Sequence, residues 1–199
     1  MLPAGPARAD AVEVGLSRIR DYLGLVGIAS LVLGLDQLSK YLVRTRLAFG
    51  ETWSPFPWLA GVVRVVYWNN TGAAFGLFPS GGLVFTVVAI IVSVAILYYY
   101  PRLPRGYFPL RLALGLQLGG AIGNLTDRLL HGTVIDFISV GSFPVFNLAD
   151  SSISIGVAIL IVTMWIDERR NKAAEAETTG AGIQSVSHTG ASSTEHPLE

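Results

Sequence analysis

The chain has 199 residues, a formal net charge of zero and no cysteine. Hydrophobic residues make up 51% of it and charged residues 14%, against roughly 25% in soluble domains. The absence of cysteine excludes disulfides, thiolate metal ligands and a cysteine nucleophile. The neutral charge balance gives no sign of a nucleic-acid partner. With a mean hydropathy of +0.53, the composition indicates a membrane protein.

Four apolar segments are predicted to be membrane-spanning helices. A helix needs ~20 residues to cross ~30 Å of hydrocarbon, and it satisfies its own backbone polar groups there. The segments are residues 22–43, 82–100, 112–126 and 148–166. The third is short, so its charged end at Asp127 and Arg128 is expected at the interface. The predicted fold is an all-α membrane protein with four transmembrane helices.

A small extracytoplasmic β element is predicted between the first two spans, at about residues 44–78. This stretch holds tryptophans and prolines and the β-type run Val62–Tyr67. Tryptophan and tyrosine favour the membrane interface, and β-branched residues favour strands. The predicted domains are a cytoplasmic extension (1–20), a membrane domain (21–167) and a disordered cytoplasmic tail (168–199), too polar and small-sided to bury a core.

Basic residues predict the orientation of these helices. Arginines precede the first span, occupy the connection at residues 101–111 and follow the last span. By the positive-inside tendency, both termini are then cytoplasmic. Four polar clusters consequently meet at the outer membrane face, which predicts one composite site. The clusters are residues 36–40, 69–76, 119–128 and 134–150.

Two aspartates, Asp136 and Asp150, are the candidate reactive groups. An ionised carboxylate near hydrocarbon is costly, so such residues usually serve a function. Two converging carboxylates can share one proton, the arrangement with which aspartic proteases activate water. Each also has a structural interpretation. Asp150 precedes an apolar helix and would serve as its N-cap, and Asp136 would be an ordinary loop residue.

The remaining polar residues also allow structural interpretations. Asp36 and Lys40 have the i,i+4 spacing of a helical ion pair. Asn70 and Gly72 are typical of a turn.

The third predicted helix carries glycines and a charged pair. Gly115, Gly119 and Gly123 recur every four residues, which favours close packing of a neighbouring helix over ligand binding. Asp127 and Arg128 are expected to form an interfacial anchor or ion pair, and Arg128 alternatively a contact to a carbonyl or lipid headgroup.

The order and spacing of these clusters resemble the lipoprotein signal peptidase family, also called signal peptidase II. The resemblance extends roughly over residues 22–166. The matching stretches are DQLSK from Asp36, NNTGAAFG from Asn69, GGAIGNLTDR from Gly119, VIDF from Val134 and FNLAD from Phe146. Five motifs in order within one four-span chain are highly specific.

The resemblance implies a bacterial cell-membrane aspartic endopeptidase. Such enzymes cleave the signal peptide of diacylglyceryl-modified prolipoproteins just before the lipid-modified cysteine. No metal or cofactor is expected. The chain is expected to act as a monomer surrounded by membrane lipid. The residues that correspond to the family's site are Asp136 and Asp150 as catalytic pair; Asn70, Gly72, Asn124, Arg128 and Asn147 in substrate binding; and Asp36, Lys40 and Asp127 in structural support.

Two other functions are open on the residues alone. Intramembrane carboxylates also mark proton-coupled transporters, although these usually have midplane sites and inverted repeats. A non-catalytic membrane assembly subunit would explain the glycine stripe but not the clustered aspartates and asparagines.

Overall fold

The computed structural model describes residues 6–72, 81–104 and 106–190. These ranges hold four α-helices, two short 3-10 helices and a three-stranded sheet. In chain order the elements are α1 (Pro6–Arg46), β1 (Thr52–Trp53), η1 (Pro57–Leu59), β2 (Val63–Asn70), α2 (Gly82–Tyr99), η3 (Tyr100–Arg102), α3 (Phe108–His131), β3 (Val134–Val140) and α4 (Leu148–Gly190).

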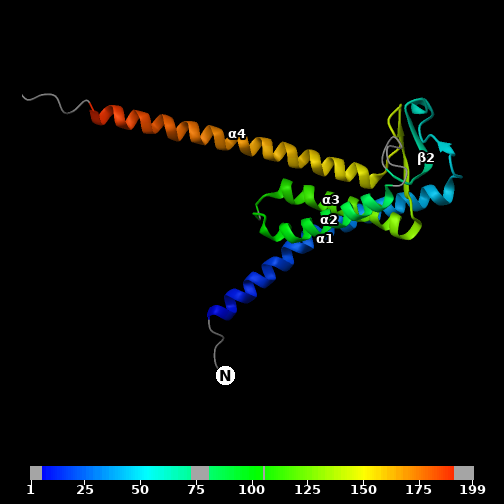
Figure 1. Cartoon of the computed structure of the whole chain (residues 1–199), viewed down its shortest axis with the longest axis horizontal. Coiled ribbons are helices and arrows are strands. Elements are labelled where there is room, and N and C mark those ends of the chain that lie inside the picture. Colours follow the sequence, from blue (N-terminus) through cyan, green and yellow to red (C-terminus); the bar gives the residue numbers. More distant parts are fainter. Residues whose placement is uncertain (1–5, 73–80, 105, 191–199) are drawn as a thin grey trace, which may run out of the picture. The chain divides into compact units, whose positions relative to one another are not determined.

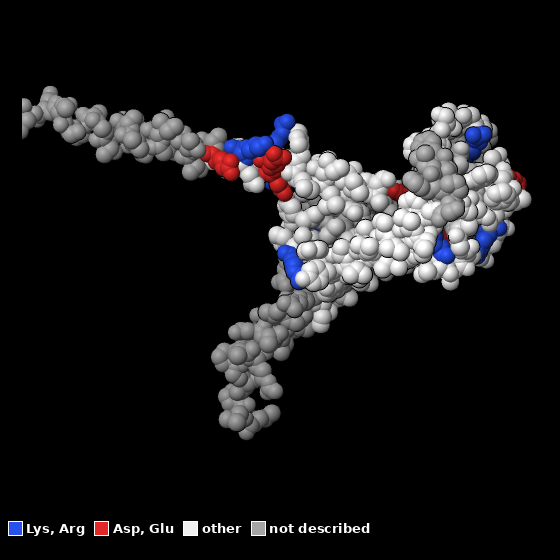
Figure 2. Space-filling view, in the orientation of Figure 1, with Lys and Arg blue, Asp and Glu red and all other residues white. Residues whose placement is uncertain are grey.

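Three of the described helical stretches are long and apolar enough to cross a membrane: Ile19–Arg46, Gly82–Arg102 and Leu148–Glu175. They contain three of the four predicted spans. The helix α3 is not among them, so the count of four spans stays a prediction. On the face shown in Figure 2, few charged side chains lie along the middle of the α1–α3 bundle.

The helix α3 contacts both α1 and α2 (Figure 1), and its glycines allow the close approach to α1. A Cβ atom added at Gly115 would lie 2.7 Å from the Ile28 side chain. One added at Gly119 would lie 2.7 Å from Val32 Cβ and 2.8 Å from the Ala29 carbonyl oxygen. The predicted packing role of these two glycines is confirmed.

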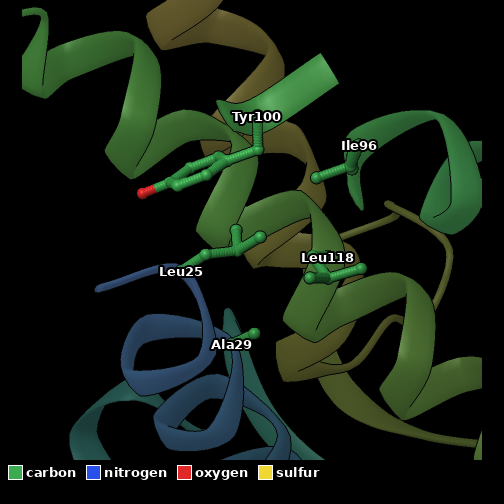
Figure 3. Close-up of a cluster of buried hydrophobic side chains, with 5 residues drawn as sticks. All are labelled: Leu25, Ala29, Ile96, Tyr100 and Leu118. Carbon is green, nitrogen blue, oxygen red and sulfur yellow. The ribbon is translucent and has the colours of Figure 1, made fainter. Parts of the chain in front are cut away.

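A hydrophobic cluster joins α1, α2, η3 and α3 (Figure 3). Leu25 and Ala29 come from α1, Ile96 from α2, Tyr100 from η3 and Leu118 from α3. All five side chains are buried. Because the cluster fixes the relative positions of α1 and α3, it also fixes the polar residues further along both helices.

The sheet lies at the opposite end of this bundle (Figure 1) and has the strand order β1-β2-β3 with antiparallel pairing. The β2 strand contains most of the predicted run Val62–Tyr67, which confirms a β element there. Residues 73–78 of the predicted element lie outside the described residues.

The third strand, β3, differs from the expectation, because it comes from the segment between α3 and α4. Asp136 therefore lies on a strand, opposite Trp68 of β2, and not in a loop. Four consecutive β3 residues, Val134–Phe137, are buried, so the usual alternation of a strand is missing. The partner strand is also far away in sequence, and a local pattern does not show such pairing.

Contacts divide the chain into two units, Met1–Ile159 and Leu160–Glu199, with the boundary inside α4. In the second unit Lys172 Nζ lies 2.6 Å from Glu168 Oε1, and the Arg169 guanidinium lies over the Trp165 ring. The residues of the candidate site belong to the first unit. The predicted domain limits stay predictions.

Candidate active site

Asp150 is held at the start of α4 by a reciprocal pair of hydrogen bonds with Asn147. The Asp150 backbone N–H donates to Asn147 Oδ1 at 2.9 Å, and the Asn147 backbone N–H donates to Asp150 Oδ2 at 3.2 Å. This is a capping box, in which the residue before the helix and the third helical residue satisfy each other. Asn147 is thus the N-cap. The N-cap interpretation of Asp150 is wrong in position, since Asp150 is the third helical residue.

Asn147 also connects the two aspartates. Its side-chain Nδ2 donates to Asp136 Oδ1 at 2.7 Å, while its backbone N–H contacts Asp150. The other oxygen of Asp136 accepts a hydrogen bond from Asn70 Nδ2 at 2.8 Å. Pairing of β2 with β3 brings Asn70 to Asp136, and the chain then turns into α4. One fully buried asparagine therefore joins both carboxylates.

Asn124 of α3 reaches the same site from the helix bundle. Its Nδ2 donates to Asp150 Oδ1 at 2.7 Å. Its Oδ1 accepts hydrogen bonds from Lys40 Nζ at 3.0 Å and from Asn147 Nδ2 at 3.1 Å. These two donors fix the amide orientation, so the Asn124 NH₂ group must face Asp150.

The environment of Asp136 favours its protonated form. Burial raises the pKa of Asp136 to about 6, and the negative charge of Asp150 acts in the same direction. Hydrogen bonds from Asn70 and Asn147 act in the opposite direction, because they stabilise the ionised carboxylate. A carboxyl group that titrates near neutral pH is suited to general acid–base chemistry.

A cavity of about 570 Å³ opens beside the two aspartates. Its walls combine the polar residues with apolar side chains from α2, α4 and the segment after β3. The lining residues are Asn70, Gly72, Phe85, Asn124, Arg128, Val134, Asp136, Phe143, Pro144, Val145, Phe146, Asp150, Ser151, Ser154 and Ile155. All of the predicted catalytic and substrate-binding residues line it except Asn147, which is fully buried.

Arg128 and Gly72 have defined contacts at the cavity wall. The Arg128 guanidinium lies 5.6 Å from the centre of the Phe85 ring, and its Nη1 donates to the Asn124 carbonyl at 3.4 Å. The Gly72 N–H donates to Asn70 Oδ1 at 2.9 Å, which is the predicted turn. The same turn aims the Asn70 Nδ2 at Asp136, so the turn and site interpretations of Asn70 are compatible.

A second buried cluster, consisting of Asp36, Lys40 and Asp127, lies next to the site. Lys40 Nζ is 2.8 Å from Asp36 Oδ2 and 2.8 Å from Asp127 Oδ2, and all three residues are at most 2% exposed. The predicted Asp36–Lys40 pair is confirmed. Asp127 pairs with Lys40 rather than with the adjacent Arg128 in the ion pairs described.

The cluster holds the backbone beside each aspartate of the site. Asp127 Oδ2 accepts the N–H of Ile135 at 3.2 Å, and Asp36 Oδ1 accepts the N–H of Ala149 at 2.9 Å. Ile135 immediately precedes Asp136, and Ala149 immediately precedes Asp150. The cluster of Asp36, Lys40 and Asp127 therefore helps to position both carboxylates of the site.

Sequence reasoning missed several apolar and hydroxyl residues at the site. Phe85 comes from α2, and Ser151, Ser154 and Ile155 follow Asp150 at spacings that place them along the cavity side of α4. The helical spacing from Asp150 is a signal that was available in the sequence. Within the described parts of the chain, no group of three His, Asp or Glu side chains is arranged to hold a metal ion.

The chain matches a known protein family in comparisons of both sequence and structure. The model of the signal peptidase (SPase) II family matches residues 28–166. The chain is 47% identical over 133 residues to the lipoprotein signal peptidase of Moorella thermoacetica, covering 67% of this chain and 87% of that protein. It is 38% identical over 149 residues to that of Bacillus subtilis, covering 73% and 95%.

Structural comparison agrees with the sequence comparison. A solved structure described as a bacterial membrane enzyme has a TM-score of 0.67 and 32% identity, covering 72% of this chain and 88% of that one. Fold, apolar helices and relatives together define a bacterial membrane peptidase. The chain belongs to the signal peptidase II family.

Proposed function

We propose that this protein is an aspartic endopeptidase that removes the signal peptide from diacylglyceryl-modified prolipoproteins, just before the lipid-modified cysteine. The names of its relatives, lipoprotein signal peptidases, support the substrate class. The main support for an aspartic mechanism is that Asn147 hydrogen-bonds to both Asp136 and Asp150 at the edge of a cavity.

The proposed reaction is hydrolysis by a carboxylate pair that shares one proton. The ionised aspartate takes a proton from water while the water oxygen bonds to the scissile carbonyl carbon. The protonated aspartate donates a hydrogen bond to the carbonyl oxygen. When the carbon–nitrogen bond breaks, the leaving amine takes a proton from the pair, which returns to its starting state. Acid–base assistance of this kind contributes ~10²–10⁴-fold.

The surrounding residues would position the substrate. Asn70, Gly72 and Arg128 line the cavity from different elements, and with Asn124 and Asn147 they would orient an extended backbone and the two carboxylates. The apolar walls would accept acyl chains of the substrate. Asp36, Lys40 and Asp127 would serve as structural support, since they hold the backbone beside each aspartate.

We further propose four membrane spans that include α3, with both termini cytoplasmic and the aspartates at the outer face of the bacterial inner membrane. The chain has no cysteine, so a single introduced cysteine reports its own position. An impermeant thiol reagent applied to intact cells with a permeable outer layer should label Arg64→Cys and spare Arg102→Cys, both at exposed positions. Labelling of Arg102→Cys alone would reverse the topology.

The function is tested by incubating the purified chain, as a monomer in lipid nanodiscs, with a diacylglyceryl-modified precursor. Mass spectrometry should show a mature product that begins with the lipid-modified cysteine. Unlipidated precursor should remain intact. A chelator should leave the rate unchanged. Absence of cleavage in several lipid mixtures would contradict the proposal, and a metal requirement would replace the carboxylate mechanism.

A further inference from the structure

A second cavity, of about 250 Å³, extends the site along α3 between α2 and α4. Four residues, Phe85, Asn124, Arg128 and Asp150, line both this cavity and the larger one. The remaining lining is apolar except for one residue, Gln117 of α3. The other lining residues are Val88, Ala89, Val92, Ala121 and Ile153. The second cavity is thus an apolar continuation of the site with a single amide in its wall.

The Gln117 side chain is partly buried, and its amide nitrogen is a buried donor without an acceptor. Its Nε2 atom is inaccessible and has no hydrogen-bond partner among the described residues. Its stem is fixed by α4, since a Cβ atom added at Gly156 would lie 2.8 Å from Gln117 Cγ and 3.4 Å from Nε2. An unpaired buried donor is unfavourable and rare, so its retention beside a cavity points to an acceptor supplied by a ligand.

Helical spacing places Gln117 in line with the site. Gln117, Asn124 and Arg128 are seven and four residues apart, which puts them on one face of α3. Seven residues correspond to roughly 10 Å along a helix. An extended chain covers roughly 10 Å in three residues. A substrate backbone that passes from the aspartates along α3 therefore reaches Gln117 about three residues from the scissile bond.

A signal peptide that enters as a membrane helix brings a matching acceptor. The last four carbonyls of a helix have no partner within it. In hydrocarbon no water is present to satisfy them, so each needs a donor from protein. The segment next to the scissile bond must be extended for cleavage, so the signal helix ends shortly before it. Its orphaned carbonyls and the orphaned Gln117 donor would then satisfy each other.

We propose that substrate binding turns the Gln117 amide toward the cavity, where Nε2 donates a hydrogen bond to a main-chain carbonyl at the carboxyl-terminal end of the bound signal helix, about three residues before the scissile bond. Gln117 is then a substrate-binding residue that favours substrates whose signal helix ends about three residues before the scissile bond. The inference rests on the proposed function. A diacylglyceryl ester carbonyl is the other acceptor of the same chemistry, and the experiment separates the two.

The first experiment compares Gln117→Met with wild type and with Ser93→Ala. Met nearly keeps the length and shape of Gln but cannot donate. The kcat/KM for a lipid-modified precursor should fall about threefold to tenfold, the effect of one lost hydrogen bond. The thermal midpoint should stay or rise, because an unpaired buried donor is gone from the free enzyme. Ser93 also has a buried unpaired oxygen but does not line the cavity, so its variant should keep wild-type kcat/KM.

The second experiment identifies the acceptor on the substrate, and it uses wild-type enzyme as well. A thioamide, a weaker acceptor, replaces one main-chain carbonyl at two, three or four residues before the scissile bond. For one of these substrates, the kcat/KM of wild type should be about threefold to tenfold lower than for the unmodified substrate. The kcat/KM of Gln117→Met should be the same for both substrates. The loss caused by Gln117→Met should persist for a substrate with ether-linked chains, which lack ester carbonyls.

The outcomes separate this inference from the proposed function. If wild type does not cleave any lipid-modified precursor, the proposed function fails. If wild type cleaves, but Gln117→Met is equally active and no thioamide substrate is impaired, only this inference fails. If the ether-linked substrate abolishes the Gln117→Met effect, the acceptor is the lipid ester and the signal-helix assignment is overturned.

Discussion

Two pairs of carboxylates lie side by side in this protein and have opposite surroundings. Asp36, Asp127 and Asp136 are buried, and Asp150 is partly buried. Asp36 and Asp127 share an ammonium group, with Lys40 Nζ 2.8 Å from each. Asp136 and Asp150 are instead held by neutral amides of asparagines. Asp36 and Asp127 are buried within the protein and are called the closed pair. Asp136 and Asp150 line a cavity and are called the open pair.

The difference teaches how structural and reactive carboxylates are told apart. A cation between two carboxylates offsets their mutual repulsion and pairs with both charges. Amides orient the carboxylates of the second pair without neutralising them, and burial raises the pKa of Asp136. The two pairs are also connected, since Asp36 and Asp127 hold the backbone beside Asp150 and Asp136. In the proposed function, Asp36 and Asp127 are the structural support, and Asp136 and Asp150 are the reactive groups.

Removing a carboxylate from the open pair should have the largest effect on activity. Asp136→Asn and Asp150→Asn should each lower turnover of a lipid-modified precursor by ~10²–10⁴-fold, to background. Folded yield should change little, because Asn keeps the shape and one acceptor oxygen at each position. Turnover and the thermal midpoint of each purified variant check this. Near-normal turnover by either variant would remove the distinction between the pairs.

Removing the cation from the closed pair should act on stability. Lys40→Met leaves two buried carboxylates without their partner, which costs ~3–5 kcal/mol of unfolding free energy. Lys172→Met is the control, because its pair with Glu168 is exposed and worth ~0–1 kcal/mol. Denaturant unfolding in mild detergent compares them. A Lys40→Met variant with wild-type stability but no turnover would show that Lys40 takes part in chemistry.

A methyl group at the α3–α4 contact should disturb the open pair indirectly. A Cβ atom at Gly120 would lie 2.5 Å from the Ala149 carbonyl oxygen, next to Asp150. Gly120→Ala should therefore cost ~1–3 kcal/mol of stability and lower kcat. Gly27→Ala on α1, where no atom lies within 4 Å of the added Cβ, should leave both unchanged. Equal behaviour of the two variants would contradict the described contact.

The smallest expected effect is on the pH profile. The Asn70 hydrogen bond stabilises ionised Asp136, so Asn70→Ala should raise the pKa of Asp136 further above its ordinary value. The proton then persists to higher pH, so the alkaline limb of the kcat/KM profile should lie at higher pH in the variant than in wild type. A limb that stays in place or moves to lower pH would show that Asn70 does not act on this carboxyl group.

The elements with strong local signals could be predicted from the sequence. The apolar runs predicted three of the spans, helical spacing predicted the Asp36–Lys40 pair, and the four-residue repeat predicted that Gly119 packs against a helix. The prediction that the polar clusters meet in one composite site also led to residues that line one cavity.

The remaining features depend on contacts between distant segments. The β3 strand has a continuous buried run and pairs with β2 some 66 residues earlier, as the Asn70–Asp136 bond shows. Nothing local shows that Lys40 also contacts Asp127 and Asn124 on another helix. The capping box at Asn147 and Asp150 was readable from their spacing of three, and so was the alignment of Gln117 with Asn124.

The central claim is that Asp136 and Asp150 act as one unit, and a double-mutant cycle tests it most directly. Turnover of a lipid-modified precursor is measured for wild type, Asp136→Asn, Asp150→Asn and the double variant, each purified and folded. Residues that act as a unit are not additive, so the double variant should be scarcely slower than either single one. A double variant whose loss equals the product of the two single losses would show independent roles and contradict the account.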